Sequence, residues 1–191
     1  MKFDVVIAGI GGQGVLTAAT FISRMALASG LQVKQSEVHG MAQRGGTVVA
    51  QVRIADAIVE SSLIRYAGAG LIIGFEPLEA LRVLHLLSPD GWIVTTTDQV
   101  RNFSDYPQDT LLDSYFSRLP HCFRFNGRDK ARNSGIENAS SMIVLGAASR
   151  HIPFFDGGDS DRVIGELFKG KGDFVVDMNR TAFRLGRELQ Q

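Results

Sequence analysis

Three glycines near the start of the chain have the spacing of a phosphate-binding turn. Gly9, Gly11 and Gly14 form the pattern Gly-x-Gly-x-x-Gly, and Gly12 and Gln13 make it unusually rich in glycine and polar groups. Glycine lets the backbone turn tightly and approach a pyrophosphate, and the N-terminus of a following helix supplies free N–H groups. Three functions remain open: close packing of a helix on a strand, binding of a phosphate-bearing ligand other than NAD, and binding of NAD(P) or flavin.

A second group of polar residues and glycines follows at positions 37–46. Its candidate ligand- or partner-binding residues are Glu37, His39, Gln43, Arg44, Gly45 and Gly46. Arg44 can clamp a phosphate or carboxylate through two parallel hydrogen bonds, and His39 can donate a proton or anchor a ligand. Ligands of open α/β sheets bind at the carboxyl ends of strands, and this segment follows a predicted strand, which favours a binding loop. The alternative is a solvated loop in which Arg44 pairs with Glu37.

Buried strands and helices must position these two segments. Residues 3–10 form a continuous apolar run typical of a strand in a parallel sheet, and apolar residues recur at helical spacing from Val15 to Ala26. With a strand at 31–36, they predict a strand–helix–strand unit. Further strands are predicted at 47–54, 57–64 (its hairpin partner), 70–76, 92–97 and 122–127. Helices are predicted from Pro77 and over 139–149, 162–169 and 173–189, with loops at 37–46 and 101–110 and an N-cap at Ser160 or Asp161. Residues 1–191 therefore predict a single α/β domain, Rossmann-like, with a mostly parallel sheet covered by helices.

Composition narrows the classes of function. Lys plus Arg and Asp plus Glu both number 20, so the basic surplus of a nucleic-acid-binding protein is missing. Cys122 is the only cysteine, which excludes an intrachain disulfide, prevents this chain from holding an iron–sulfur cluster alone, and favours an intracellular protein. The four histidines are scattered, so no metal site is expected. We see no signal peptide and no apolar stretch of ~18 residues, and we expect no membrane contact and a cytoplasmic location.

Longer segments resemble one enzyme family. GIGGQGVLTAA (9–19) followed by SEVHGMAQRGGTVVAQVRI (36–54) resembles the gamma-type domain of the 2-oxoacid:ferredoxin oxidoreductases. The HGMAQRGG form (39–46) is most similar to the beta subunit of the indolepyruvate-specific members. FEPLEALR (75–82) and MNRTAFRLG (178–186) also match the family's pattern, so the likeness spans nearly the whole chain. Residues 98–135 depart most from that pattern.

The resemblance implies an accessory subunit rather than a complete enzyme. Such enzymes decarboxylate a 2-oxoacid oxidatively, pass two electrons to ferredoxin and form an acyl-CoA, using thiamine diphosphate, Mg²⁺ and iron–sulfur clusters. A thiamine site of this kind needs a Gly-Asp-Gly stretch and an Asn-Asn pair, but here Gly158-Asp159 is followed by Ser160, and no Asn-Asn pair occurs. We therefore expect these cofactors on a larger catalytic partner subunit, and CoA as a candidate ligand of this chain.

The alternative is a free-standing oxidoreductase that binds NAD(P) or flavin. The glycine turn would then hold the pyrophosphate, and Glu37 would bind the ribose, because an acidic residue is expected ~20 residues beyond the turn. The two hypotheses differ in what the isolated chain should bind.

Overall fold

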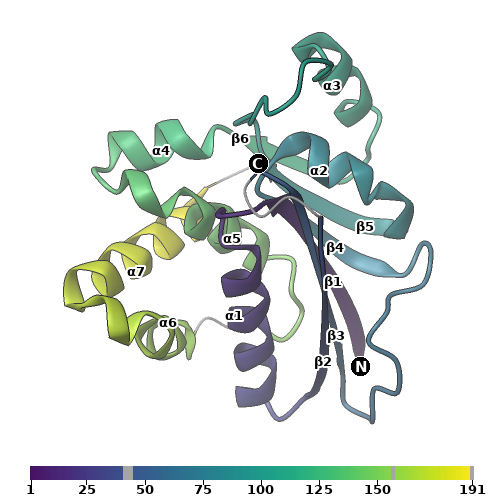
Figure 1. Cartoon of the computed structure of the whole chain (residues 1–191). Coiled ribbons are helices and arrows are strands. Elements are labelled where there is room, and N and C mark those ends of the chain that lie inside the picture. Colours follow the sequence, from purple (N-terminus) through teal and green to yellow (C-terminus); the bar gives the residue numbers. More distant parts are fainter. Residues whose placement is uncertain (41–44, 156–157, 190–191) are drawn as a thin grey trace.

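Six strands form one sheet, and helices cover both of its faces (Figure 1). The structure is a computed structural model and describes residues 1–40, 45–155 and 158–189. The strands are β1 (Lys2–Ile10), β2 (Gln32–His39), β3 (Thr47–Ala55), β4 (Ala69–Gly74), β5 (Leu87–Thr96) and β6 (Cys122–Phe125). The α-helices are α1 (Val15–Ala28), α2 (Pro77–Arg82), α3 (Asp109–Phe116), α4 (Gly127–Asn133), α5 (Ser140–Ser149), α6 (Ser160–Phe168) and α7 (Asp173–Glu188). Short 3-10 helices cover Leu84–Leu86, Glu137–Ala139 and Lys169–Lys171.

The order of the strands across the sheet is β2-β3-β1-β4-β5-β6. β4 pairs in parallel with β1 and β5, and β6 pairs in parallel with β5, whereas β3 is antiparallel to both β1 and β2. Five of the six strands therefore run in one direction, and the expected α/β fold with a mostly parallel sheet is confirmed. The predicted strand–helix–strand unit is modified, because β3 is inserted between β1 and β2.

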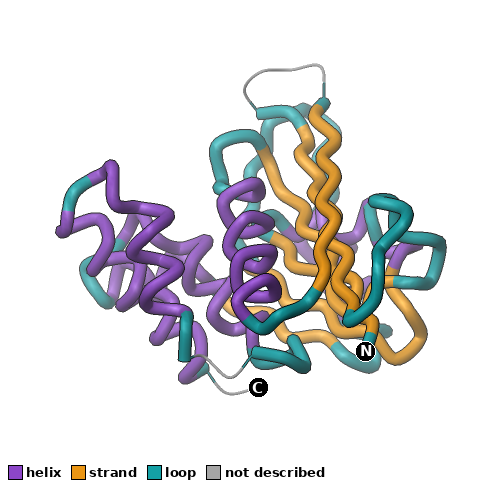
Figure 2. Tube along the Cα trace, turned by 90° about the horizontal axis from the view of Figure 1, so that it is seen from below, coloured by secondary structure: helices purple, strands orange, loops and turns teal. Residues whose placement is uncertain are grey.

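Two apolar clusters hold the helices on the sheet. On one face, β1 residues Val5 and Ile7 pack with α1, α5, α6 and α7 in the larger cluster. Figure 2, viewed from below, shows this thick helical layer beside the strands. On the opposite face, Val6 and Ala8 pack with α2 and the end of α3 in a smaller cluster. Because successive strand residues point to opposite faces, a β1 that is buried on both sides has the continuous apolar sequence seen at 5–8.

Helices α5 and α7 pack in close contact within the layer of helices that forms the larger apolar cluster. Residues 142–149 of α5 are all buried, as expected for a helix that is apolar on every side. A Cβ atom added at Gly146 would lie 2.1 Å from the carbonyl oxygen of Phe183, and one at Gly186 would lie 2.0 Å from that of Ile143. The backbones of α5 and α7 are therefore in direct contact at these two glycines.

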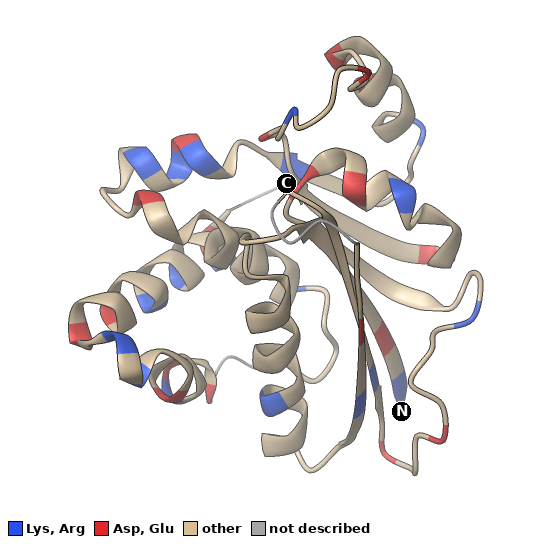
Figure 3. Ribbon diagram, in the orientation of Figure 1, with Lys and Arg blue, Asp and Glu red and all other residues tan. Residues whose placement is uncertain are grey.

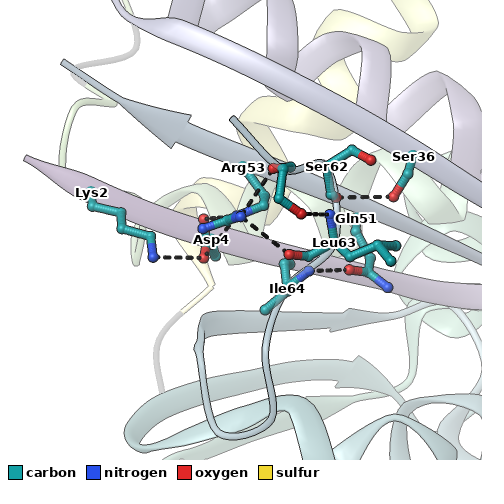
Figure 4. A network of polar contacts seen from close by, with 9 residues as sticks. Lys2, Asp4, Ser36, Gln51, Arg53, Ser62, Leu63 and Ile64 are labelled. Carbon is teal, nitrogen blue, oxygen red and sulfur yellow. Dashed lines mark hydrogen bonds and ion pairs between the residues drawn. The ribbon is translucent and has the colours of Figure 1, made fainter. Parts of the chain in front are cut away.

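Residues 56–66 are not the strand that was predicted at 57–64. They form an irregular segment, because side chains from β2 and β3 hydrogen-bond to its backbone in place of a ladder (Figure 4). Arg53 donates to the carbonyl oxygens of Ser61 (2.9 Å) and Leu63 (3.1 Å), and the Gln51 side chain accepts from the Ile64 amide at 2.6 Å. Arg53 also pairs with Asp4, which is only 2% exposed.

Several other boundaries differ from the sequence prediction. The segment predicted as a loop at 37–46 begins as strand, because β2 continues to His39 through its ladder with β3. Helix α3 begins inside the predicted loop at 101–110, and α4 was not predicted at all. Asp159, rather than Ser160 or Asp161, occupies the N-cap position of α6, and its side chain makes no capping hydrogen bond.

Candidate functional site

The glycine turn joins the end of β1 to the start of α1. Gly12 and Gly14 have positive φ angles of 97° and 83°, which side chains rarely adopt, and Gly14 is the N-cap residue of α1. As a glycine, Gly14 has no side chain with which to cap this helix, and the first turn of α1 contains no acidic residue. The first-turn amides and the positive end of the helix dipole are therefore available to an anion.

Gln13 and Gly9 have structural roles in the turn. The Gln13 side chain accepts a hydrogen bond from the Ile10 amide at 2.7 Å and donates one to the carbonyl oxygen of Phe75 at 3.0 Å. A Cβ atom at Gly9 would lie 2.9 Å from Gln13 Oε1 and 3.0 Å from a methyl group of Val15. Gly9 thus lets the Gln13 side chain fold under the turn and link β1 to the end of β4.

A pocket of about 640 Å³ lies between the glycine turn and the end of β2. We call it the glycine-turn pocket; its walls are Ile10, Gly11, Gly12, Gly14, Val15, Leu16, Thr17, His39, Gly40 and Val48. The structure therefore brings His39 of the second motif to the glycines of the first. One wall consists of backbone and the first turn of α1, which suits the phosphate end of a ligand.

Glu37 and His39 belong to a polar row on β2. Alternate residues of a strand share a face, and here Gln35 Nε2 donates to Glu37 Oε1 at 2.8 Å, while Glu37 Oε2 lies 3.5 Å from His39 Nε2. Glu37 is not among the described residues that line the glycine-turn pocket. Since β3 separates β2 from β1, Glu37 is displaced by one more strand spacing of ~4.8 Å than in a sheet where β2 adjoins β1. This displacement disfavours Glu37 as a ribose ligand.

The turn between β2 and β3 is anchored to the glycine turn on the described side. The Gly40 amide donates to the carbonyl oxygen of Thr47 at 2.8 Å, and the Gly11 amide donates to that of Gly46 at 2.9 Å. Gly45 has a φ of 74°. Gln43 and Arg44 lie outside the described residues, so their predicted roles remain predictions.

A second pocket, which the sequence did not predict, lies on the other side of Gly12. This switch-point pocket of about 240 Å³ lies at the carboxyl ends of the neighbouring strands β1 and β4. From these two strands the chain continues to opposite halves of the sheet, and such a point is the usual ligand position in open α/β folds. Its walls are Gly12, Gln13, Phe75, Thr96, Asp98, Arg128, Glu137, Asn138, Ser140, Ser141 and Val144. Thr96 is the last residue of the buried strand β5 and Asp98 follows shortly after it, and that position at the carboxyl end of a strand was the available sequence signal.

Side chains at the end of β5 hold α4 at this pocket. Thr96 Oγ1 accepts from the Gly127 amide at 3.2 Å, and Asp98 Oδ2 accepts from the Arg128 amide at 2.8 Å. An adjoining hollow of about 160 Å³ extends the pocket to Lys171. Figure 3 shows α1 with few charged residues, whereas charges concentrate on α4, α6 and α7. Arg128 and Lys171 place positive charge at this pocket, and Asp98 and Glu137 place negative charge there.

The chain does not carry the ligands of the family's redox cofactors. Its one thiol, Cys122, is partly buried, and burial raises its pKa to about 11, so it is poorly suited to bind iron as a thiolate. Among the residues described, no group of three or more His, Cys, Asp or Glu residues is placed to hold a metal ion. Within the same ranges, no helix is long and apolar enough to cross a membrane.

Comparison with known proteins identifies the family. A family model described as pyruvate ferredoxin/flavodoxin oxidoreductase matches residues 4–189. The chain belongs to this family. Indolepyruvate oxidoreductase subunit IorB from Pyrococcus horikoshii is 43% identical to this oxidoreductase-family chain, with 97% of the chain and 94% of the relative covered. The subunit of the same name from Methanothermobacter thermautotrophicus is 32% identical, with 97% and 96% covered. The family resemblance expected from the sequence is confirmed.

Solved structures show the same fold. Pyruvate oxidoreductase subunit PORC from Thermotoga maritima superposes with a TM-score of 0.73 at 21% identity, covering 98% of this oxidoreductase-family chain and 96% of that one. A 2-oxoglutarate:ferredoxin oxidoreductase from Magnetococcus marinus, solved with 2-oxoglutarate, coenzyme A and succinyl-CoA bound, gives a TM-score of 0.75 at 20% identity. There the match covers 97% of this chain but only 30% of the longer Magnetococcus chain.

Proposed function

We propose that this chain is the accessory subunit of a 2-oxoacid:ferredoxin oxidoreductase specific for indolepyruvate or a similar arylpyruvate. The observation that carries the proposal is 43% identity to a protein named indolepyruvate oxidoreductase subunit IorB, over nearly the full length of both chains. The assembled enzyme would decarboxylate the 2-oxoacid oxidatively, transfer the electrons to ferredoxin and release an acyl-CoA.

A larger catalytic subunit would carry thiamine diphosphate, Mg²⁺ and the iron–sulfur clusters. The support is chemical: four thiolates normally hold one cluster, and this chain has only Cys122. Both thiamine motifs are also missing from its sequence. The single cysteine and the ferredoxin acceptor favour the cytoplasm as the place where this subunit works.

The glycine-turn pocket would bind a phosphate-bearing part of CoA. The uncapped N-terminus of α1 offers several amides to an anion, and a Cβ atom added at Gly12 or Gly14 would meet nothing within 4 Å. The pocket's volume of about 640 Å³ is in the range of small-molecule sites, ~300–1,000 Å³.

Reconstitution tests the proposed function. The chain should co-purify with a subunit that carries thiamine and cluster motifs, and the pair should reduce ferredoxin in the presence of CoA and indolepyruvate. We expect at least about tenfold lower activity without this chain, and lower activity with pyruvate or 2-oxoglutarate. Full activity of the catalytic subunit alone, or a preference for 2-oxoglutarate, would contradict the proposal.

A further inference from the structure

Residues 97–106 cross from the end of β5 to the turn between β2 and β3. The segment lies in the part of the chain that departs most from the family's sequence pattern, and hydrogen bonds fix it at two distant points. At one point Tyr106 donates to Glu76, and at the other the Asn102 side chain donates to the carbonyl oxygen of Gly45. Contacts at the end and in the middle of this ten-residue segment give it a defined path across the carboxyl edge of the sheet.

Glu76 is the fixed end of this arrangement. It is fully buried, with 0% of its surface exposed, and its carboxylate faces three donors. Oε2 accepts from the Glu79 amide at 2.9 Å and so caps α2, while Oε1 accepts from the Tyr106 hydroxyl and from the Val100 amide at 3.4 Å. A buried carboxylate needs such donors, and hydrogen bonds to an ionised acceptor are stronger than neutral ones. Burial and the neighbouring Glu76 also raise the pKa of Tyr106, so its hydroxyl remains a donor.

Aromatic and charged side chains on either side of Asn102 also hold the segment in place. The Phe103 ring lies 5.5 Å from the Tyr106 ring, and the Arg82 guanidinium lies 5.9 Å from the centre of Phe103. Arg101 pairs with Asp109 at the start of α3, at 2.7 Å. These contacts attach the segment to α2 and α3, the helices on the face of the sheet that carries the smaller apolar cluster.

Asn102, in the middle of the segment, reaches the wall of the glycine-turn pocket. Asn102 holds the carbonyl oxygen of Gly45, and the next carbonyl oxygen, that of Gly46, accepts from the amide of Gly11 at 2.9 Å. Gly11 begins the glycine turn and lines the pocket. A continuous series of contacts therefore runs from buried Glu76, through Tyr106 and Asn102, to the backbone that would bind the ligand.

We infer that Asn102 and Tyr106 are positioning residues, which hold the Gly45–Gly46 backbone against Gly11 and thereby set the shape of the glycine-turn pocket. The inference rests on the proposed function only for the identity of the ligand. Neither side chain is among the described residues that line the pocket, so both act through the Gly45–Gly46 turn. The segment at 97–106 would therefore tune affinity for the phosphate-bearing ligand rather than react with it.

Two measurements on variants test the inference. Asn102→Asp keeps the size of the side chain but cannot donate to Gly45, and Tyr106→Phe removes only the hydroxyl. In the assembled enzyme each variant should raise the KM for CoA about three- to tenfold, the effect of one lost hydrogen bond, with kcat at saturating CoA unchanged. In the isolated chain, hydrogen exchange at the Gly11 amide should accelerate by a similar factor. Ser104→Ala, at an exposed position in the same segment, is the matched control and should behave as wild type.

The outcomes separate the inference from the proposed function. If both variants keep the wild-type KM for CoA and the wild-type exchange rate at Gly11, the positioning role is overturned. If the wild-type enzyme does not use CoA, the proposed ligand is wrong, while faster exchange at Gly11 in the variants would still support positioning. An equal loss of kcat in both variants with KM unchanged would overturn positioning in favour of a general structural role.

Discussion

At the glycine turn, the Gln13 side chain accepts a hydrogen bond from the Ile10 amide and donates one to the Phe75 carbonyl oxygen, which gives it a role in the turn itself. The same side chain also lines the switch-point pocket, and its predicted role in ligand binding stays a prediction. The remaining polar groups of the turn are backbone amides, which recognise charge rather than the identity of a ligand. Specificity at this pocket must therefore come from residues beyond the turn, such as His39.

Glu79 should make the stability of the protein depend on pH. It is 4% exposed, and its Oε2 is buried without a hydrogen-bond partner among the described residues. Burial raises the pKa of Glu79 above its ordinary value of 4.5, although a hydrogen bond with Thr47 and the charge of Arg82, at 3.5 Å, partly oppose this. The unfolded chain then ionises at lower pH than the folded one, so the free energy of unfolding should fall as pH rises through the raised pKa.

Replacing Glu79 by glutamine should remove this dependence. We expect Glu79→Gln to be more stable than wild type at neutral pH, with the difference disappearing below about pH 4, where the acid is protonated in both states. Urea denaturation across this range measures the effect, and Glu60→Gln, at an exposed position, serves as the control. A variant less stable than wild type at neutral pH would show that the carboxylate contributes an essential contact.

At the scale of elements, the segment at 56–66 depends on Arg53. The guanidinium binds two carbonyl oxygens of the segment and pairs with Asp4, whose side chain is 1% exposed. Arg53→Ala should cost about 2–4 kcal/mol of stability, because Asp4 is left buried with only Lys2, at 3.7 Å, as its counter-ion. Denaturant unfolding measures this loss.

A matched control variant distinguishes loss of the Arg53–Asp4 ion pair from the general effect of removing a positive charge. Arg65 is exposed in the same part of the chain, and Arg65→Ala should change stability by less than about 0.5 kcal/mol. If Asp4→Asn combined with Arg53→Ala recovers most of the stability lost in Arg53→Ala, the uncompensated charge is the cause. No recovery would place the cost in the lost contacts to the segment.

At the scale of the whole molecule, the sheet places both pockets around one turn. The inserted β3 carries Val48 to one side of the glycine turn, while β5 and α4 bring Thr96, Asp98 and Arg128 to the other. A ligand with an extended chain and several phosphates, such as CoA, can use both sides of Gly12. Glu37, in contrast, lies on β2, which β3 separates from β1, and this strand order disfavours a ribose-binding role of the kind seen in dinucleotide-binding folds.

The position of the two pockets around the glycine turn leads us to expect that the purified chain prefers CoA to nicotinamide or flavin nucleotides. In thermal-shift titrations with CoA, NADH, NADPH and FAD, we expect stabilisation by CoA alone. CoA at about 100 times its dissociation constant should add about 2.7 kcal/mol. Stabilisation by a nicotinamide or flavin nucleotide that Glu37→Ala weakens would instead support a free-standing oxidoreductase.

The sequence by itself determined the local and compositional features. The continuous apolar run predicted the buried strand β1, and the helical spacing of apolar residues predicted α1 after the glycine turn. The two elements could be told apart because apolar residues recur with distinct periods in buried strands and amphipathic helices. The single cysteine excluded clusters on this chain without any coordinates. The long family motifs carried the assignment that the family model then confirmed.

Only the tertiary structure decided which distant segments meet. The antiparallel insertion of β3 between β1 and β2 was not predictable, since pairing partners depend on long-range contacts rather than local pattern. The conformation of residues 56–66 was not predictable either. Their sequence resembles a strand, but hydrogen bonds with the Arg53 and Gln51 side chains hold them as an irregular segment. The roles of Asn102, Tyr106 and Asp98 come from contacts to residues 30 to 57 positions away. No local pattern encodes such contacts, because their geometry exists only once the sheet has formed.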